Sequence, residues 1–419
     1  MSDVFDRIIL HVDLNSFFAT AEQQANPFLR GKPVGILKAQ GRTCVIAASI
    51  EAKKQGVKTG MALSDAKKLC PSLILVPADF DKYADITYRF INICKSYSPA
   101  CEVFSLDECF IDVTESEKFY GNAFNIAFDL KDRIRREIGD YISCSIGISH
   151  NRYLAKLASG QIKSDGLFWI TPDNMLDVLD KSDLMDVCGL GRGLYKHLIA
   201  LSVDNFLTLR LCSLEFLYKH FGPFWSVHLY NLARGIDHSQ VNPFYELPDA
   251  KSVGRTYTTH RNLYKKEEIW QLLRNLCEEA TAKARLMNLV GRYVGIVFRG
   301  GEASYYGHRT LKTYINDPRI FFEICAEITK DWPLGKSLPV RFCGVTLGML
   351  TKKEFLPTPL FPSERRRNRL IGAIDRINNQ FGDYTVYPAV LSRMPIIRPE
   401  VNGYFGDKSY RLRYLLREK

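Results

Sequence analysis

Short apolar runs alternate with helix-like segments along the first 170 residues. Residues 7–14 (RIILHVDL) and 141–149 (YISCSIGIS) have the pattern of buried strands, and residues 123–139 have that of a helix. Residues 101–114 (CEVFSLDECFIDVT) are typical of a β-hairpin. Strands interleaved with helices, together with a hairpin, predict a mixed α+β layer.

The pattern changes twice more along the chain. Residues 172–240 are predicted to be mainly helical, and residues 241–250, with two prolines and no regular period, are interpreted as a linker. Strand-like and helix-like segments alternate again from 251 to about 350, which predicts a second α/β unit. Residues 351–419 contain a predicted basic helix and a tail that the pattern does not assign. A chain of 419 residues also exceeds what one core usually organises, so several domains are expected.

Charge is distributed unevenly between the two halves. The net charge of the whole chain is +11, yet residues 1–250 carry a net charge of −3 and residues 251–419 carry +14. This asymmetry predicts that the C-terminal part binds a polyanion, although any single basic cluster could merely keep the surface soluble.

The eleven cysteines are scattered, with no C-x-x-C spacing, which fits reduced thiols better than disulfides or zinc. The N-terminus lacks a signal-peptide pattern, and no apolar stretch approaches membrane-spanning length. We therefore expect a cytoplasmic protein that does not contact a membrane.

Three carboxylates occupy positions where predicted strands end or turn: Asp13, Asp107 and Glu108. Hard divalent cations prefer oxygen ligands, so convergence of these acids would make a site for phosphoryl transfer. Solvated strand-end acids are the alternative for any one of them alone. Asp107 and Glu108 also pose a steric problem, because neighbouring side chains on a regular strand point to opposite faces.

Three ordered motifs then point to a family. Residues 11–36 (HVDLNSFFATAEQQANPFLRGKPVGI), 105–114 (SLDECFIDVT) and 145–166 (SIGISHNRYLAKLASGQIKSDG) resemble the motifs of Y-family translesion DNA polymerases, closest to the DNA polymerase IV branch. The resemblance implies a multidomain α+β, right-hand polymerase fold. It places a palm at 1–18 and 75–171, fingers at 19–74, a helical thumb at 172–240, the linker at 241–250, an α/β little finger at 251–350 and a C-terminal extension at 351–419.

The same resemblance implies a low-fidelity, template-directed DNA polymerase. Asp13, Asp107, Glu108 and the carbonyl of Leu14 would hold two Mg²⁺ ions, with Mn²⁺ as a possible substitute. A local twist or bulge at the hairpin bend would turn both acids of the pair toward one space. The ring of Phe18 would exclude a ribose 2′-hydroxyl, whereas Asn151 and Lys156 are interpreted as a helix cap and as a solvated or structural residue.

The incoming nucleotide is expected to contact Arg42, Lys53 and Lys163. Here the chain departs from the family, which commonly has threonine, tyrosine and arginine where this sequence has Ala47, Ile50 and Lys53. Isoleucine cannot donate a hydrogen bond, and lysine carries a point charge where arginine would donate two parallel hydrogen bonds. Contacts to the nucleotide on this side should therefore be weaker or differently arranged.

Primer-template DNA and deoxynucleotides are the implied partners of a monomer. The loop CGLGRG is expected to aim backbone amides at a phosphate through Gly189 and Gly191. Basic residues on the little-finger strands would follow the DNA backbone: Lys251, Arg255, Arg292, Arg299, Arg309, Lys312 and Arg341. Leu360 and Phe361 faintly resemble a sliding-clamp peptide, but Pro357 replaces its glutamine; a linker burying two apolar residues is the alternative.

Two other functions fit part of the pattern. A catalytically weak or inactive polymerase-like accessory would explain the altered nucleotide edge but not three retained acids. A cyclase or other phosphotransferase on a similar palm would explain the acids but not the basic C-terminal half.

Overall fold

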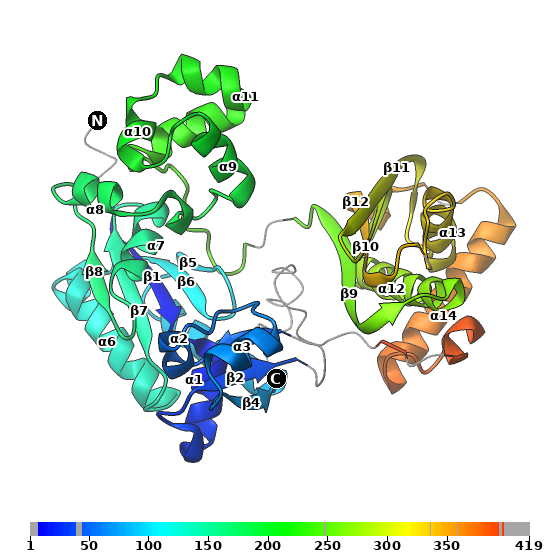
Figure 1. Ribbon diagram of the computed structural model, residues 1–419, viewed down its shortest axis with the longest axis horizontal. Helices are drawn as coiled ribbons and strands as arrows, with labels where there is room; N and C mark the ends of the chain where they lie inside the picture. The colour runs from blue at the N-terminus through cyan, green and yellow to red at the C-terminus, as the bar shows by residue number, and fades with distance from the viewer. Residues whose placement is uncertain are drawn as a thin grey trace. The chain divides into compact units, whose positions relative to one another are not determined.

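The computed structural model describes residues 7–38, 44–246, 249–335, 337–357, 359–393 and 396–397. The chain forms two compact units, which divide between residues 246 and 249 (Figure 1). Arg42, one of the predicted nucleotide ligands, lies outside the described residues. No helix in the described part of the chain combines the length and apolar character needed to span a membrane.

A five-stranded sheet in the order β5-β6-β1-β7-β8 forms the centre of the first unit. Its strands are β1 (Ile9–Leu14), β5 (Cys101–Val103), β6 (Glu108–Asp112), β7 (Cys144–Ser149) and β8 (Leu167–Trp169). The strand β1 pairs antiparallel with both β6 and β7, and β7 pairs parallel with β8. Ile9, Leu10 and Val12 are fully buried, which explains why this short apolar run forms the central strand.

Helices connect the strands of this sheet and also pack against it. They are α1 (Phe17–Ala25), α4 (Phe80–Lys95), α5 (Glu117–Tyr120), α6 (Ala123–Glu137) and α7 (Arg152–Gln161). The helix α7 can lie directly on β7 because Gly147 has no side chain; a Cβ atom there would overlap the backbone of α7. Asn151 caps α7 by accepting a hydrogen bond from the Leu154 amide, which confirms its predicted role.

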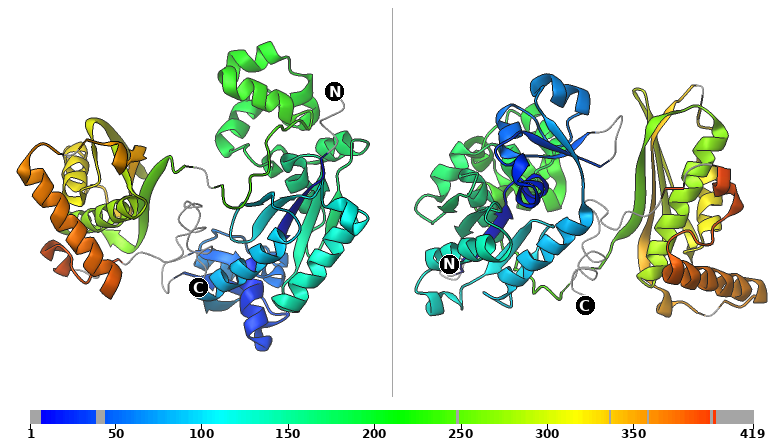
Figure 2. Two further views of the ribbon diagram at one scale, coloured as in Figure 1. Left: turned by 180° about the vertical axis from the view of Figure 1, so that it is seen from behind. Right: turned by 90° about the horizontal axis from the view of Figure 1, so that it is seen from below.

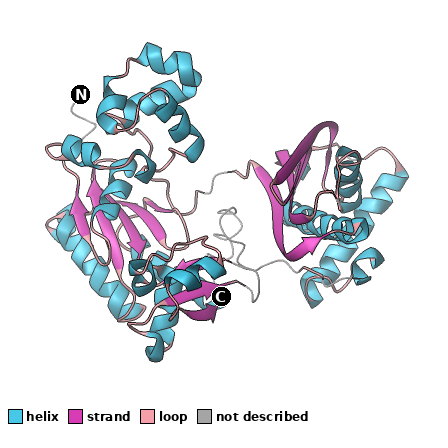
Figure 3. Ribbon diagram, viewed as in Figure 1, coloured by secondary structure: helices cyan, strands magenta, loops and turns pink. Residues whose placement is uncertain are grey.

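A second, three-stranded sheet in the order β3-β2-β4 lies in the same unit (Figure 3). Its elements are β2 (Val34–Leu37), β3 (Val45–Ala48), α2 (Ile50–Lys54), α3 (Leu63–Leu69) and β4 (Ile74–Pro77). They share a small separate core around Val45, Ala52 and Leu73.

A helical cluster completes the first unit. It consists of α8 (Met175–Lys181), α9 (Arg192–Ala200), α10 (Phe206–Leu211) and α11 (Leu214–Leu232). Leu154 and Leu157 of α7 belong to its core, so α7 connects the cluster to the central sheet. The helix α11 is kinked at Gly222, which has a φ of 74° and is followed by Pro223.

The second unit contains an antiparallel sheet in the order β11-β10-β12-β9 with helices against one face (Figure 2). Its elements are β9 (Ser252–Leu263), α12 (Lys266–Leu286), β10 (Leu289–Gly300), β11 (Ala303–Ile315), α13 (Pro318–Ile328), β12 (Val340–Lys352) and α14 (Pro362–Phe381). These elements and those of the first unit confirm the predicted α+β fold class.

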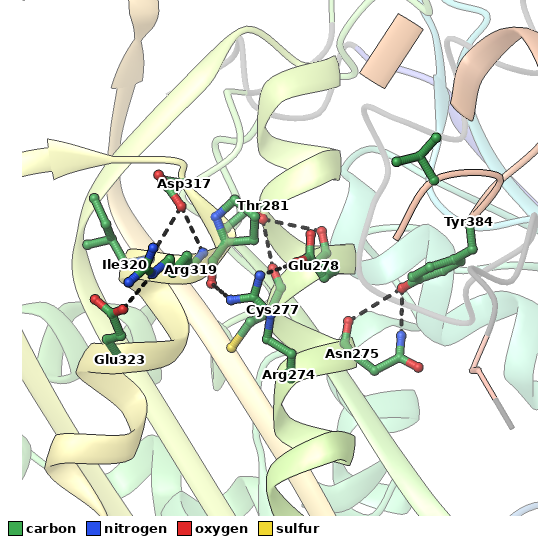
Figure 4. Close-up of polar contacts among 12 residues, drawn as sticks. Arg274, Asn275, Cys277, Glu278, Thr281, Asp317, Arg319, Ile320, Glu323 and Tyr384 are labelled. Atoms are coloured by element: carbon green, nitrogen blue, oxygen red, sulfur yellow. Dashed lines mark hydrogen bonds and ion pairs between the residues drawn. The ribbon is translucent and has the colours of Figure 1, made fainter. Parts of the chain in front are cut away.

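The C-terminal extension is fastened to α12 by polar contacts. Arg285 forms a two-pronged ion pair with Asp375 of α14, with distances of 2.6 and 2.8 Å. Nearer the start of α12, the Asn275 amide donates to the Tyr384 hydroxyl at 2.6 Å (Figure 4). The predicted basic helix is therefore attached to the second unit by polar contacts, and none of its residues is buried.

Candidate active site

The three predicted acids converge at one end of the central sheet. Antiparallel pairing of β1 with β6 places Asp13 directly opposite Glu108. Paired residues present their side chains on the same face, and here that face is covered by α7. Asp107 precedes β6 by one residue and is close enough to Asp13 for its charge to affect the Asp13 carboxyl.

The turn before β6 resolves the steric problem of two adjacent acids. Asp107 belongs to this turn and not to the strand, so strand alternation does not force it to the face opposite Glu108. The Ser105 hydroxyl donates to Asp107 Oδ1 at 2.5 Å, and the Leu14 amide donates to the Asp107 carbonyl at 2.9 Å. The β1–β6 register runs from Ile9 to Asp13 without a bulge. Of the two expected devices, a twist or a bulge at the hairpin bend, only a change of direction in the turn itself is compatible with this register.

Electrostatic repulsion is built into this acidic cluster. Burial, reinforced by the charges of Glu108 and Asp107, raises the pKa of Asp13 to about 7. Burial also raises the pKa of Asp107, although its hydrogen bond from Ser105 opposes the rise. Carboxylates held in this way are stabilised by a nearby cation.

Lys156 of α7 supplies one such cation. Its Nζ lies 2.7 Å from Glu108 Oε1 and 4.6 Å from the centre of the Phe104 ring. The ion pair is largely shielded from water, with the two side chains 25% and 18% exposed. Of the two interpretations of Lys156, solvated or structural, this ion pair favours the structural one, because the lysine contacts a candidate metal ligand directly.

The donor set suits a hard divalent cation. Asp13, Asp107 and Glu108 provide carboxylate oxygens, and Leu14 lies beside them at the end of β1. Within the described ranges, no group of three or more His, Cys, Asp or Glu residues forms a site that could hold a metal ion. Magnesium does not require a preformed group of three, because substrate phosphates and water commonly supply its remaining ligands.

Aromatic rings surround the predicted gate residue. Phe18 lies in the first turn of α1, is only 5% exposed, and stacks on Tyr83 of α4 with ring centres 4.2 Å apart and an interplanar angle of 11°. Phe80 meets the Phe18 ring edge-on at 6.1 Å. Phe18 thus has a fixed orientation two residues after Ser16, which adopts a left-handed backbone with φ 50°.

Two lysines were predicted from the sequence to contact the incoming nucleotide, Lys53 and Lys163. Lys53 Nζ donates to Ser16 Oγ at 2.8 Å. Although Lys53 reaches solvent, partial desolvation lowers its pKa, while the charge of Asp13 opposes this and that of Lys163 adds to it. Lys53 therefore lies near the acids, and Lys163 lies near Lys53. Ala47 and Ile50 lie at the end of β3 and the start of α2.

The turn carrying Lys163 is tied to α6. Asp165, two residues later, pairs with Lys131 at 2.8 Å and also with Arg135. Ser164 and Asp165 adopt positive φ angles, so the chain reverses sharply here.

The predicted phosphate loop has the expected helical context. Gly189 has a φ of 99°, which favours glycine, and Gly191 is the N-cap of α9. The His228 ring of α11 lies beside Gly189.

Strand alternation divides the basic residues of the second unit between two faces. Arg255 pairs with buried Glu279 of α12 at 2.6 Å, and Arg309 pairs with Glu327 of α13 at 2.6 Å. Both arginines thus lie on the helix-covered face. In contrast, Arg299 faces the other side of the sheet, because it comes one residue after Phe298, which like Ile296 points into the core. Its guanidinium lies over the ring of Phe342. Lys312 has the opposite parity to Arg309 along β11 and joins this second face.

The remaining predicted DNA contacts lie at strand ends and irregularities. Lys251 precedes β9, whereas Arg292 and Arg341 coincide with register shifts of β10 and β12. Leu360 and Phe361 lie just before α14 and are 78% and 61% exposed, so they do not form the buried pair that a simple linker would make.

Comparison with known proteins supports one family. The impB/mucB/samB family matches residues 12–160, and the C-terminal domain of that family matches residues 250–357. The chain is 34% identical over 386 residues to the DNA polymerase IV of Pelotomaculum thermopropionicum, which covers 91% of this chain and 94% of that protein.

The chain belongs to the DNA polymerase IV branch of the Y-family. The DNA polymerase IV of Moorella thermoacetica is 33% identical, covering 92% of this chain and 96% of that relative. A solved Y-family DNA polymerase chimera matches the fold with a TM-score of 0.70 and 26% identity, over 82% of this chain and 99% of the other. These matches confirm the family and polymerase fold expected from the three motifs.

Sequence reasoning missed the contact of Lys156 with the candidate site, although the sequence carried a detectable signal for it. Lys156 interrupts an otherwise apolar helical segment, with buried Ala155, Leu157 and Ala158 around it. A lysine in such a segment needs an acidic partner or a route to solvent. The palm, fingers, thumb and little-finger boundaries stay predictions.

Proposed function

We propose that this polymerase extends a primer 3′-hydroxyl along a DNA template and performs low-fidelity translesion synthesis. The convergence of Asp13, Asp107 and Glu108 on adjacent strand ends carries this proposal. Repulsion within a cluster of three carboxylates, two of them with raised pKa values, destabilises the folded protein unless a cation binds there.

The chain's own residues would share the work at this site. Asp13, Asp107, Glu108 and the carbonyl of Leu14 would hold two Mg²⁺ ions, or Mn²⁺ as a substitute. Bound cations of this kind activate the primer hydroxyl and neutralise charge on the triphosphate. Ser105 would keep Asp107 aimed at the site through its 2.5 Å hydrogen bond, and Lys156 would orient Glu108.

Nucleotide selection would rest on the segment around α1 and α2. Phe18 would act as the steric gate against ribose, supported by its close packing on Tyr83. Lys53 and Lys163 would bind the triphosphate, since Lys53 lies near the acids and Lys163 adds a second positive charge beside it. Arg42 stays a prediction as a third nucleotide contact.

DNA would be held through both units. Gly189 and Gly191 would direct backbone amides toward a phosphate. In the second unit, Arg299 and Lys312 are the strongest candidates, with Lys251, Arg292 and Arg341 at strand ends and irregularities. We do not include Arg255 and Arg309 among the proposed DNA contacts, because each forms an ion pair with a glutamate on the helix-covered face.

We further propose that the polymerase acts on cytoplasmic DNA as a monomer. Leu360 and Phe361 would dock on a sliding clamp, an assignment supported by their exposure.

Primer extension with Mg²⁺ and deoxynucleotides tests the polymerase activity. Wild type should extend a primer, and Asp107→Ala should bind primer-template DNA equally but extend it at least about 1,000-fold more slowly, since it removes a metal ligand. Asp85→Asn, which alters an exposed ion pair on α4, is the matched control. A wild type that binds DNA but cannot extend it would establish the accessory function instead.

A further inference from the structure

The Phe18 ring is supported from behind by a tyrosine of a different helix. Tyr83 is 1% exposed and lies almost parallel to Phe18, with ring centres 4.2 Å apart. Phe80 and Phe17 contact the same pair at ring distances of about 6 Å. Movement of the Phe18 ring toward α4 would therefore have to displace Tyr83.

Tyr83 is itself fastened through its hydroxyl group. The hydroxyl donates to Glu22 Oε1 at 2.8 Å, and Lys82 Nζ donates to Glu22 Oε2 at 2.8 Å. Glu22 is 6% exposed, so a buried carboxylate of α1 receives a phenol and an ammonium group from α4. Charge-assisted hydrogen bonds of this kind are stronger than neutral ones and prefer a defined geometry.

The helix α4 also contacts the acidic turn. Thr87 lies one helical turn after Tyr83 and is fully buried. Its hydroxyl donates at 2.8 Å to the carbonyl of Leu106, the residue before Asp107. One helix therefore fixes both the ring behind Phe18 and the turn that presents a candidate metal ligand.

We propose that the Tyr83–Glu22 hydrogen bond, reinforced by Lys82, is a specificity-determining anchor for sugar selection. The inference rests on the proposed role of Phe18 as the steric gate. A gate that excludes a 2′-hydroxyl by collision works only if its ring cannot yield, since a small displacement would relieve the clash. Tyr83 and Glu22 are positioning residues, and they act by raising the cost of that displacement.

Single-nucleotide primer extension measures the anchor directly. The readout is the ratio of kcat/KM for a deoxynucleotide to that for the matching ribonucleotide. Tyr83→Phe keeps the stacked ring but removes the hydrogen bond, and it should lower this ratio by about threefold to tenfold, the range that one net hydrogen bond supplies. The deoxynucleotide kcat/KM should change less than about twofold, because that substrate does not press on the gate.

Glu22 variants test the same bond from its other end. Glu22→Ala should lower the ratio as Tyr83→Phe does, and the double variant should show no further loss, because both changes remove one interaction. Glu22→Gln retains a carbonyl that can accept from Tyr83 and should recover most of the selectivity.

Tyr97→Phe is the matched control. Its buried hydroxyl donates to Asp129 Oδ2 at 2.6 Å in the same unit, and Tyr97 packs against Tyr120 and Arg133. This variant should keep the wild-type ratio.

Phe18→Ala separates failure of the anchor from failure of the gate. If Phe18→Ala lowers the ratio strongly while Tyr83→Phe and Glu22→Ala retain the wild-type value, the gate stands and the anchor is refuted. If Phe18→Ala leaves the ratio unchanged, both the gate assignment and the anchor are refuted, whereas the proposed polymerase activity is not. An equal loss in Tyr97→Phe would also refute the anchor, because it would show a general response to lost packing.

Discussion

Replacing Asp13 by asparagine should stabilise the metal-free protein at alkaline pH while abolishing its activity. The folded state raises the pKa of Asp13 from 3.8 to about 7, so the folded chain holds this proton more tightly than the unfolded chain. Stability therefore falls as pH rises from about 4 to 7 and stays lower above that range. Asparagine cannot ionise, so the variant avoids this loss.

The size of the effect follows from the pKa difference. At about 1.4 kcal/mol per pKa unit, a shift of roughly three units costs up to about 4 kcal/mol above pH 7. Coupling to Asp107 and Glu108 spreads this cost over the cluster, so it is an upper bound for one residue. The advantage of Asp13→Asn should shrink steadily on acidification toward pH 4.

Guanidinium unfolding in the presence of EDTA, at intervals from pH 4 to pH 8, provides the assay. The transition of the second unit serves as an internal reference, because the substitution lies in the first. Asp112→Asn is the matched control, since Asp112 lies on the paired strand but forms an ion pair with Arg7 at 3.1 Å and should lose stability. An Asp13→Asn protein no more stable than wild type at pH 8 would refute the reasoning, as would an advantage independent of pH. Millimolar Mg²⁺ should stabilise wild type more than Asp13→Asn.

Four further changes test other parts of the structure. Lys156→Met should lower the Mg²⁺ concentration for half-maximal primer extension by about threefold to tenfold, because a cation no longer competes for Glu108; an unchanged requirement would contradict this. Lys53→Ala should raise the deoxynucleotide KM by about tenfold to a hundredfold through loss of a charged contact, measured by steady-state extension. Arg299→Ala should weaken DNA binding and reduce its salt dependence by about one charge, whereas Arg309→Ala should not, as fluorescence anisotropy at several salt concentrations would show. Tyr384→Phe should cost the second unit about 1 kcal/mol in thermal unfolding, and Tyr387→Phe, an exposed change in the same segment, should cost nothing.

The sequence revealed the acids because their position depends on local features. Asp13 ends an apolar run, and Glu108 begins another, so both were assignable to strand ends before their pairing was known. Asp107 was also predicted, at the hairpin bend, but the hydrophobic pattern did not show what sets its direction. Its direction depends on a turn stabilised by Ser105 and by the Leu14 amide, and hydrogen bonds of that kind are not visible in a hydrophobic pattern.

Tertiary partners explain most of what sequence reasoning did not find. The pairing of Lys156 with Glu108 joins residues 48 positions apart, and that of Tyr83 with Glu22 joins residues 61 apart. Arg255 and Arg309 are a different case, because they share strand parity with Val253 and Leu311, which pack toward the helices. Strict use of the two-residue period would have removed both from the predicted DNA surface.

The positive charges of the lysines predicted to bind the nucleotide partly balance the negative charges of the acidic cluster. Lys156 and Lys53 lie close enough to Asp13 for their charges to affect its carboxyl, so part of the negative charge of the cluster is balanced before substrate enters. Lysine is a compact, mobile charge, whereas arginine would fix a planar fork on one partner. Lys53, now hydrogen-bonded to Ser16, would exchange that neutral partner for a phosphate at little cost. Lys53→Arg should therefore bind deoxynucleotide more tightly but release pyrophosphate more slowly, and burst kinetics would separate the two effects. If Lys53→Arg instead raised KM and left product release unchanged, the mobile lysine would not explain the nucleotide edge.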